Sequence, residues 1–415
     1  MIHHNSKIFR YGVMKKVIII GGGAAGFFTA INAKEMNPEL DITILEKGKE
    51  VLQKVKISGG GRCNVTHACF EPKELVQFYP RGEKELLGPF HQFMTGDTFE
   101  WFENNGIPLK IEKDNRVFPE SNSSQTIIDC FLNKTKRLGI SVLKNHGVSS
   151  IQKQGNSWLI ITKEQQFVCD AVVMAAGSSK KVWELSKALG HSIISPVPSL
   201  FTFNIKDPRI KDLLGISVPN ATVQLVDTYL EASGPLLITH WGMSGPAILK
   251  LSAFGARVLA EKNYEYKVQI DWLSRPTHKI VNVLLNLKKK QSKKQVIVRS
   301  PFEEIPKRLL ERFVIAAKIP ATFNLADLSH VQIDALANQL TKSVFIAKGK
   351  STFKEEFVTA GGVDLREINF KNFESKLQNN LFFVGEVLNI DAVTGGFNFQ
   401  NAWTGGWLCA KSLSI

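Results

Sequence analysis

A glycine pattern near the N-terminus constrains the fold more than any other feature of this sequence. It lies in "KKVIIIGGGAAGFFTAINAKEMNPELDITILEKGKE", residues 15–50. Val17–Ile20 is a β-branched run, typical of a strand buried on both faces of a parallel sheet. It leads into an apolar helix that Asn37 ends, because the residue before a proline avoids helical geometry. A second strand, Asp41–Leu45, follows, so the segment predicts a βαβ unit.

The glycines between the first strand and the helix have the spacing of a dinucleotide-binding turn. Gly21 permits the tight turn, Gly23 lets the backbone approach a pyrophosphate, and Gly26 lets the helix pack closely on the strand. Free N–H groups at the helix start favour phosphate. Glu46 is placed to accept hydrogen bonds from an adenosine ribose, which favours FAD or NAD over a 2′-phosphorylated dinucleotide. The residues predicted for this part of the site are Gly21, Gly23, Ala24, Ala25, Gly26, Glu46 and Lys47.

A second glycine loop, in "KVKISGGGRCNVTH", favours FAD. Three consecutive glycines leave the backbone bare beside side chains that donate hydrogen bonds. A dehydrogenase that binds only NAD has no need of such a loop after the first βαβ unit. The alternative is an exposed loop with expendable glycines. The predicted ligand residues here are Ser58, Gly59, Gly60, Gly61, Arg62 and Asn64.

Two later segments end in small residues at positions suited to the same ligand. Ala171–Ala176 reads as a buried strand, and Ala175, Ala176 and Gly177 let a ligand pass close to its end. Val148 follows a shorter predicted strand, where a backbone group can meet an adenine edge. Near the C-terminus, "GEVLNIDAVTGGFNFQNAWTGGW" reads as a strand end, an acidic residue, paired glycines and an apolar helix. A frayed tail fits this density of glycine and aromatic residues poorly.

Taken in order, these segments resemble the two-stretch FAD-binding domain of flavoprotein oxidoreductases. The resemblance implies that Gly385 and Glu386 lie near the ribityl chain of FAD. It also implies that the last helix points its N-terminus at the flavin pyrimidine ring, where N–H groups stabilise negative charge. The residues that it adds to the predicted cofactor site are Gly385, Glu386, Asp391, Gly395, Gly396, Phe397 and Asn398.

Four longer motifs narrow the resemblance to one family. "SGGGRCNVTH", "THWGMSGPAILKLS", "TAGGVDL" and "GEVLNIDAVTGGFNFQNAW" together are similar to the HI0933-like family of bacterial flavoproteins, the YhiN and BaiN group. The resemblance covers nearly the whole chain from Met14, the expected natural start. One departure is the stretch "PVPSLFTF", residues 196–203, where the family is expected to be more aliphatic. The resemblance implies bound FAD and an oxidoreductase activity linked to NADH or NADPH.

The predicted fold is α/β: a Rossmann-like FAD-binding domain in two sequence segments, with an inserted β-barrel that carries a small helical insert. Phe201–Leu259 alternates apolar and polar residues and is interpreted as β-structure, whereas the pattern from Thr277 to Asn338 is helical. The predicted domains are residues 14–195 and 355–415 for the FAD-binding domain, 196–276 and 339–354 for the barrel, and 277–338 for the helical insert.

His240, in "LLITHWGMSGPAIL", is the candidate catalytic residue. An imidazole facing the flavin could donate a proton to a reducible substrate. The alternative is a core or turn histidine that holds the barrel to the FAD-binding domain. No second GxGxxG follows the first, so a separate nicotinamide domain is not expected, and NADH or NADPH would visit the flavin directly.

Composition leaves the partner open. The apolar runs are too short for a membrane span, and the five scattered cysteines suit a reducing cytoplasm. No spacing typical of metal ligands is present. The net charge of +14 and the lysine run Lys288–Lys294 permit nucleic acid as a partner. The leading prediction is reduction of a small organic substrate; the alternatives are an FAD-containing protein associated with nucleic acid and an FAD-dependent tRNA modifier.

Overall fold

The computed structural model describes Lys15–Ser351 and Val358–Ile415. Met14 and the predicted domain boundary after Lys354 therefore lie outside the described residues. The chain forms two compact units. The first contains the residues up to Ser195 together with Gly361–Ile390 and Gly395–Ile415, and the second contains Pro196–Ala360 and Asp391–Thr394.

The first unit is built on a seven-stranded sheet in the order β19-β20-β21-β10-β1-β2-β6. The five strands from β21 to β6 are parallel. Val17 and Ile19 are fully buried, as the β-branched run predicts for a central strand covered on both faces. The strands are β1 (Lys16–Ile20), β2 (Asp41–Leu45), β6 (Ser141–Leu143), β10 (Ala171–Met174), β19 (Ile368–Asn369), β20 (Glu374–Ser375) and β21 (Leu381–Phe383).

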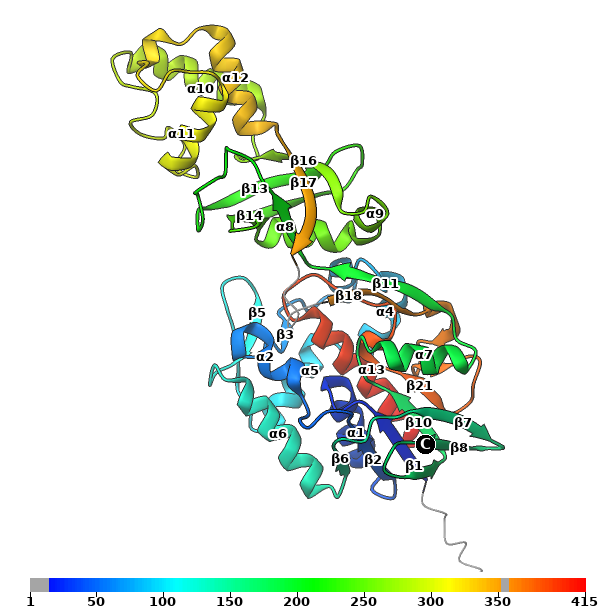
Figure 1. The fold of residues 1–415 in the computed structure, drawn as a ribbon. Helices are drawn as coiled ribbons and strands as arrows, with labels where there is room; N and C mark the ends of the chain where they lie inside the picture. The colour runs from blue at the N-terminus through cyan, green and yellow to red at the C-terminus, as the bar shows by residue number, and fades with distance from the viewer. Residues whose placement is uncertain (1–14, 352–357) are drawn as a thin grey trace, which may run out of the picture. The chain divides into compact units, whose positions relative to one another are not determined.

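Two helices from opposite ends of the chain, α1 (Ala24–Met36) and α13 (Phe397–Leu413), lie side by side in this unit (Figure 1). Gly406 allows the close approach, because a Cβ there would lie 3.1 Å from Thr29 Oγ1 and 3.3 Å from the Ala25 carbonyl oxygen. Phe28 of α1 packs its ring against Trp403 of α13 at 5.1 Å. The C-terminal helix is thus part of the core of the first unit.

The remaining elements of the first unit frame this core. Ser123 caps α6 by accepting a hydrogen bond from the Gln125 N–H. Strands β8 and β9 pair as an antiparallel hairpin. The helices are α2 (Gln53–Gly61), α3 (Pro72–Leu75), η1 (Val76–Phe78), α4 (Glu83–Phe90), α5 (Thr95–Asn104), α6 (Ser124–Arg137), α7 (Lys180–Ala188), η3 (Leu365–Glu367) and η4 (Gly385–Val387). The small sheets contain β3 (Thr66–His67), β4 (Leu109–Ile111), β5 (Arg116–Pro119), β7 (Ser150–Gln154), β8 (Ser157–Ile161) and β9 (Gln166–Cys169).

The second unit contains a closed barrel in the order β12-β15-β14-β13-β16-β17. Alternate residues of its strands, such as Ala221, Val223 and Leu225 of β13, are buried in the barrel core. The barrel strands are β12 (Thr202–Ile205), β13 (Ser217–Leu225), β14 (Glu231–Ile238), β15 (Gly242–Ser244), β16 (Glu265–Asp271) and β17 (Ser343–Ser351). A two-stranded ribbon, β11 (Ile193–Ser199) and β18 (Val358–Val363), contains residues of both units.

The interpretation of Phe201–Leu259 as β-structure is wrong in its last part, which forms α8 (Pro246–Phe254) and α9 (Ala256–Glu261). Pro246 occupies the first turn of α8, where its missing N–H costs nothing. Ala247, Ile248 and Leu251 then turn one helical face into the barrel core. The alternation of apolar and polar residues predicted strands throughout this stretch, so the helix start at Gly245-Pro246 was missed.

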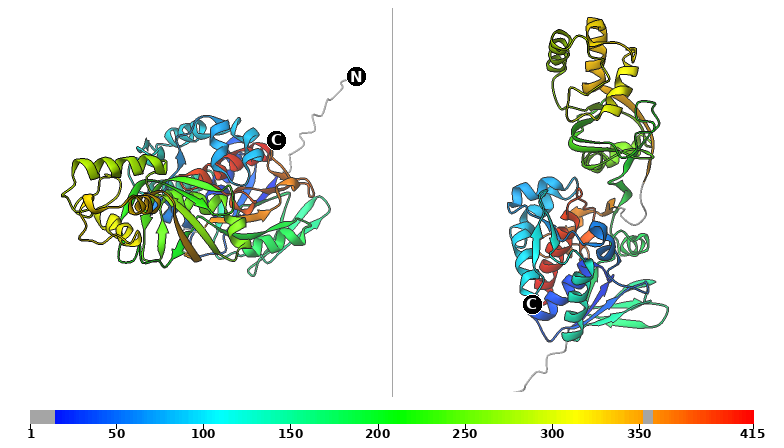
Figure 2. Two further views of the ribbon diagram at one scale, coloured as in Figure 1. Left: turned by 90° about the horizontal axis from the view of Figure 1, so that it is seen from above. Right: turned by 90° about the vertical axis from the view of Figure 1, so that its left-hand side faces the viewer.

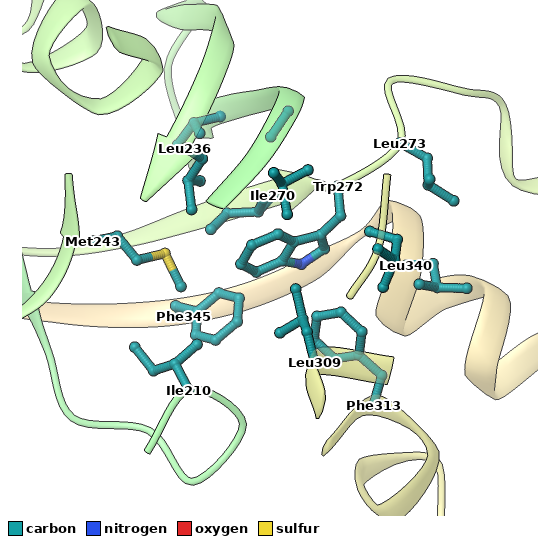
Figure 3. Close-up of a cluster of buried hydrophobic side chains, with 14 of the residues drawn as sticks. Ile210, Leu236, Met243, Ile270, Trp272, Leu273, Leu309, Phe313, Leu340 and Phe345 are labelled. Atoms are coloured by element: carbon teal, nitrogen blue, oxygen red, sulfur yellow. The ribbon is translucent and has the colours of Figure 1, made fainter. Parts of the chain in front are cut away.

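Three helices between β16 and β17 form the helical insert of the second unit: α10 (Thr277–Lys290), α11 (Lys307–Ala316) and α12 (His330–Thr341), with η2 (Leu325–Asp327) before the last (Figures 1 and 2). Figure 3 shows Trp272 where barrel and insert meet. The centroid of its buried ring lies 5.4 Å from the ring centroid of Phe313 in the insert and 6.0 Å from that of Phe345 in the barrel. Barrel and insert therefore share one core. Across the part of the chain that the structure describes, every helix is too short or too polar to cross a membrane.

Candidate cofactor site

The turn between β1 and α1 has the geometry that a dinucleotide needs. Gly21 has φ +119°, and a Cβ there would lie 2.6 Å from the Ala175 carbonyl oxygen. A Cβ on Gly26 would lie 2.1 Å from the Gly21 carbonyl oxygen. Nothing lies within 4 Å of the position for a Cβ on Gly23, and no side chain caps α1. The N–H groups of its first turn, which includes Ala24 and Ala25, therefore open onto space that a pyrophosphate can fill.

Glu46 and Lys47 directly follow β2, and the loop that contains Val148 meets them there. The Glu46 carboxylate accepts the Gly22 N–H through Oε2 at 2.9 Å and the Gly48 N–H through Oε1 at 2.7 Å. Each oxygen keeps a lone pair for a ribose hydroxyl. The Glu46 carbonyl accepts the His146 N–H at 2.8 Å, which draws the loop of buried Val148 to the same strand end.

The ends of β10 and β21 bring the two sequence segments of the site together. A Cβ on Gly385 would lie 3.1 Å from the Ala25 Cβ, so the second segment meets the first turn of α1. Glu386 forms an ion pair with Lys54 of α2. A Cβ on Gly177 would lie 3.5 Å from Glu386 Oε2. Ala175, Gly177 and Glu386 thus gather at one edge of the sheet, where ligands of parallel sheets bind.

The second glycine loop is left-handed through all three glycines, with φ of +58°, +68° and +83° at Gly59, Gly60 and Gly61. Ser58 before them is extended, so α2 is interrupted there. Only glycine adopts such a run without strain. Nothing lies within 4 Å of a Cβ placed on Gly60 or Gly61, so their backbone is open to a ligand.

The two side chains predicted to donate from this loop are engaged within the protein. Arg62 forms an ion pair of 2.6 Å with Glu112, and its guanidinium lies 3.9 Å from the centroid of the Phe118 ring. In the orientation that satisfies both ends of its amide, Asn64 donates to the carbonyls of Thr66 and Val117, and its oxygen accepts the Gly396 N–H at 3.0 Å. Arg62 and Asn64 therefore shape the site, and direct contact with the ligand stays a prediction for both.

The N-terminus of α13 is held against β3 by a set of contacts that we call the α13 clamp: Asn64, Thr66, His67 and Tyr79 around Gly395–Phe397. Gly396 has φ +95°, and a Cβ there would lie 2.4 Å from the Thr66 carbonyl oxygen. His67 Nδ1 lies 3.1 Å from the Gly395 carbonyl oxygen. The Tyr79 hydroxyl donates to the Phe397 carbonyl at 2.5 Å. The N-cap residue of α13 is Gly396, which has no side chain to bond the first N–H groups.

Aromatic rings complete the clamp. The Phe397 ring stacks on Phe78 at 4.3 Å and packs against His67 at 4.4 Å. Burial lowers the pKa of His67 below its ordinary 6.5, and the bond to the Gly395 carbonyl only partly offsets this. At neutral pH the imidazole is therefore neutral, with Nδ1–H donating to that carbonyl. The sequence alone assigns no role to His67, Phe78 or Tyr79, because their partners Gly395 and Phe397 lie more than 300 residues away.

Three further residues of the predicted site, Asn398, Asp391 and His240, lie outside the groups of contacts described above. Asn398 lies half-buried in the first turn of α13. Asp391 is fully buried and belongs to a four-residue stretch grouped with the second unit. His240 is exposed in the turn between β14 and β15 of the second unit, so it is not a core histidine. Its catalytic role stays a prediction.

The assembled residues fit FAD. Two helix N-termini that start at glycines, one carboxylate at the end of β2 and a bare glycine loop line the site of the first unit. The first N-terminus suits the pyrophosphate, and the carboxylate suits the adenosine ribose. The second N-terminus and the loop have the space and the donors for a planar ring that accepts negative charge.

Comparison with known proteins agrees with this fit. The sequence model described as "HI0933-like protein Rossmann domain" matches residues 15–412. The ribosomal RNA dihydrouridine synthase of Haemophilus influenzae is 28% identical over 96% of this chain and 98% of its own length. The 3-dehydro-bile acid delta(4,6)-reductase of Clostridium scindens is 25% identical over 96% and 99%.

Among solved structures, the 3-ketosteroid-delta4-(5alpha)-dehydrogenase of Rhodococcus jostii RHA1 in complex with 4-androstene-3,17-dione has a similar fold. The TM-score is 0.51 at 11% identity, and the match covers 98% of this chain and 99% of that one. At this identity the likeness concerns the fold alone.

Substituting Gly396 tests the α13 clamp. Gly396→Ala puts a Cβ against the Thr66 carbonyl and should weaken FAD binding more than tenfold, or about 1.4 kcal/mol. Gly190→Ala is the matched control, because Gly190 has a similar φ of +96° with nothing within 4 Å of its Cβ position. Titration of apoprotein with FAD by flavin fluorescence gives both affinities. Equal loss in the two variants would mean that strain alone matters and that the clamp does not hold FAD.

His67 makes a second prediction, on pH. A histidine whose pKa is lowered by folding contributes stability that is present above the unfolded pKa of about 6.5 and is lost as the pH falls below it. Wild-type protein should therefore release FAD progressively below about pH 6.5. His67→Asn keeps a donor for the Gly395 carbonyl but cannot titrate, so its FAD retention should depend less on pH. His330→Asn, at an exposed position, is the control, and an unchanged pH profile in His67→Asn would contradict the assignment.

Proposed function

The chain belongs to the HI0933-like family of FAD-dependent oxidoreductases, and from that premise we propose that it reduces a carbon–carbon double bond conjugated to a carbonyl group. NADH or NADPH is the proposed electron donor. The observation that carries the proposal is the N-terminus of α13, which starts at Gly396 and is held in place by the clamp. A helix N-terminus favours negative charge, which a flavin carries when it is reduced by two electrons.

The chain's own residues bind and orient the cofactor. The first turn of α1 receives the pyrophosphate, Glu46 the adenosine ribose and Glu386 the ribityl hydroxyls. Lys54 holds the Glu386 carboxylate by an ion pair and adds a positive charge beside the pyrophosphate position. When bound, FAD supplies the hydride transfer through N5, between the nicotinamide and the substrate carbon.

The bond to be reduced is proposed from what two relatives have in common. One relative's name describes the formation of dihydrouridine, and the other's describes reduction of double bonds in a 3-dehydro bile acid. In uridine, and in a 3-dehydro bile acid with double bonds at positions 4 and 6, a carbon–carbon double bond is conjugated to a carbonyl. Reduction adds a hydride to the carbon remote from the carbonyl and a proton to its neighbour, while negative charge develops on the carbonyl oxygen. The electron pair comes from the nicotinamide.

The proton needs a donor, and His240 is the proposed one. It lies exposed in a tight turn where Thr239 N–H bonds to the Gly242 carbonyl at 2.8 Å. The adjacent Trp241 is 59% exposed, which provides an apolar surface for a flat substrate beside the imidazole. The alternative from the sequence, modification of RNA, is the same chemistry on a uracil ring.

The test is an anaerobic assay of the FAD-loaded protein with NADH or NADPH. Cyclohex-2-enone, 4-androstene-3,17-dione and a uridine-containing RNA transcript are offered separately, and products are analysed by mass spectrometry. At least one should gain two hydrogens, a mass increase of about 2 Da. His240→Gln should slow this step about 100-fold, as loss of a general acid does, without slowing flavin reduction by the nucleotide.

The matched control is His330→Gln, which removes another exposed histidine of the second unit. If the flavin is reduced by the nucleotide and none of the three substrates gains hydrogen, the proposed bond chemistry is wrong. If His240→Gln and His330→Gln behave alike, His240 is not the proton donor.

A further inference from the structure

The positive charge of the chain is concentrated in one stretch of the second unit. Residues 272–302, which we call the basic segment, contain eight Lys and Arg residues and no Asp or Glu. The whole chain has 52 basic and 38 acidic residues, so elsewhere the two signs are mixed. The basic segment starts directly after β16 and covers all of α10 and most of the turns that lead to α11.

Most of these charges face solvent. One side of α10 is packed into the insert, with Ile280 and Leu284 buried. Two of the eight cations are engaged: Arg275 pairs with Glu304, and Lys288 donates to the Leu328 carbonyl. Within the described ranges the other six form no ion pair, and all are exposed: Lys279, Lys289, Lys290, Lys293, Lys294 and Arg299.

The helix dipole of α10 explains only part of this arrangement of cations. Lys289 and Lys290 lie in the last turn of α10, where cations interact favourably with the helix dipole. Lys293, Lys294 and Arg299 lie beyond the helix, where that effect has faded. A solvated surface usually intersperses both signs, because like charges repel one another. The absence of any acidic residue over the basic segment leaves this repulsion uncompensated within the segment.

A polar pocket opens beside the start of the basic segment. Its volume is about 620 Å³, and side chains that both donate and accept hydrogen bonds line it, among them Gln224, Gln269 and Thr277. Arg275 and His278 of the basic segment line it as well, and the carboxylates of Glu231 and Asp271 add acceptors to its wall. Such walls suit the edge of a nucleobase better than an apolar ring system, which needs hydrophobic contacts.

We propose that the basic segment and this pocket form a docking surface for RNA, with the exposed cations on the phosphates. The inference rests on the proposed function, because a uracil ring carries the conjugated double bond proposed as substrate. An anionic membrane is the competing partner, but a membrane-bound helix must expose its apolar face, and that of α10 is buried in the insert core. RNA needs only exposed charge and polar contacts.

The test compares two variants that lose the same charge. One replaces Lys289, Lys290, Lys293 and Lys294 by Gln; the control replaces four exposed lysines of the first unit, Lys73, Lys84, Lys163 and Lys371. Binding of the FAD-loaded proteins to a fluorescein-labelled, uridine-rich RNA hairpin is followed by anisotropy over a range of KCl concentrations. Each phosphate contact contributes about 0.7 to 0.9 to the slope of log K against log salt. The first variant should therefore lose about 3 from the slope, and the control less than about 1.

Three results would overturn the docking surface: no binding of wild-type protein to the hairpin, equal loss in both variants, or binding to phosphatidylserine vesicles in place of RNA. Flavin reduction and cyclohex-2-enone reduction are measured on the same samples. Failure of those two reactions with the predicted RNA slopes would contradict the proposed function and leave the docking surface standing. If both reactions proceed normally but the salt slopes differ from those predicted, the docking surface is contradicted and the proposed function stands.

Discussion

The hydrogen bond from the Gly396 N–H to the Asn64 side chain is the contact on which the cofactor site depends. It joins two residues 332 positions apart, and the Thr66 carbonyl lies so close that only glycine fits beside it. Through this bond the N-terminus of α13 meets the stretch that directly follows the three glycines of α2. The same helix packs along α1. The two helices whose N-termini face the candidate site therefore support each other.

The contact of the C-terminal helix α13 with the N-terminal part of the chain explains the position of the second unit in the sequence. The Rossmann-like sheet needs β21 and α13 from the end of the chain, and the barrel with its helical insert is therefore an insertion between two parts of one domain. The second unit has its own core, in which Trp272 contacts both barrel and insert. The candidate cofactor site belongs to the first unit, whereas the proposed proton donor and the proposed RNA surface belong to the second.

Local patterns predicted the parts of the fold whose cause is local. The β-branched run at Val17–Ile20, the turn glycines and Glu46 each depend on residues nearby in sequence, and they lie where they were expected. Helix α8 was missed because its Gly-Pro start lies within a run of alternating residues. The roles of Arg62 and Asn64 could not be predicted, because their partners Glu112 and Gly396 are 50 and 332 residues away. The family resemblance supplied the return of the C-terminal segment to the sheet, which no local pattern contains.

The most direct test of the account is an anaerobic visible absorption spectrum of the purified protein, recorded before and after addition of NADH and then of NADPH. The account predicts the bands of oxidised flavin, retained through gel filtration, and their bleaching by at least one of the two nucleotides. Bands that persist with both would contradict the proposed electron donor. A protein that shows no flavin bands, even after incubation with FAD, would contradict the central claim that α1 and α13 together form an FAD site.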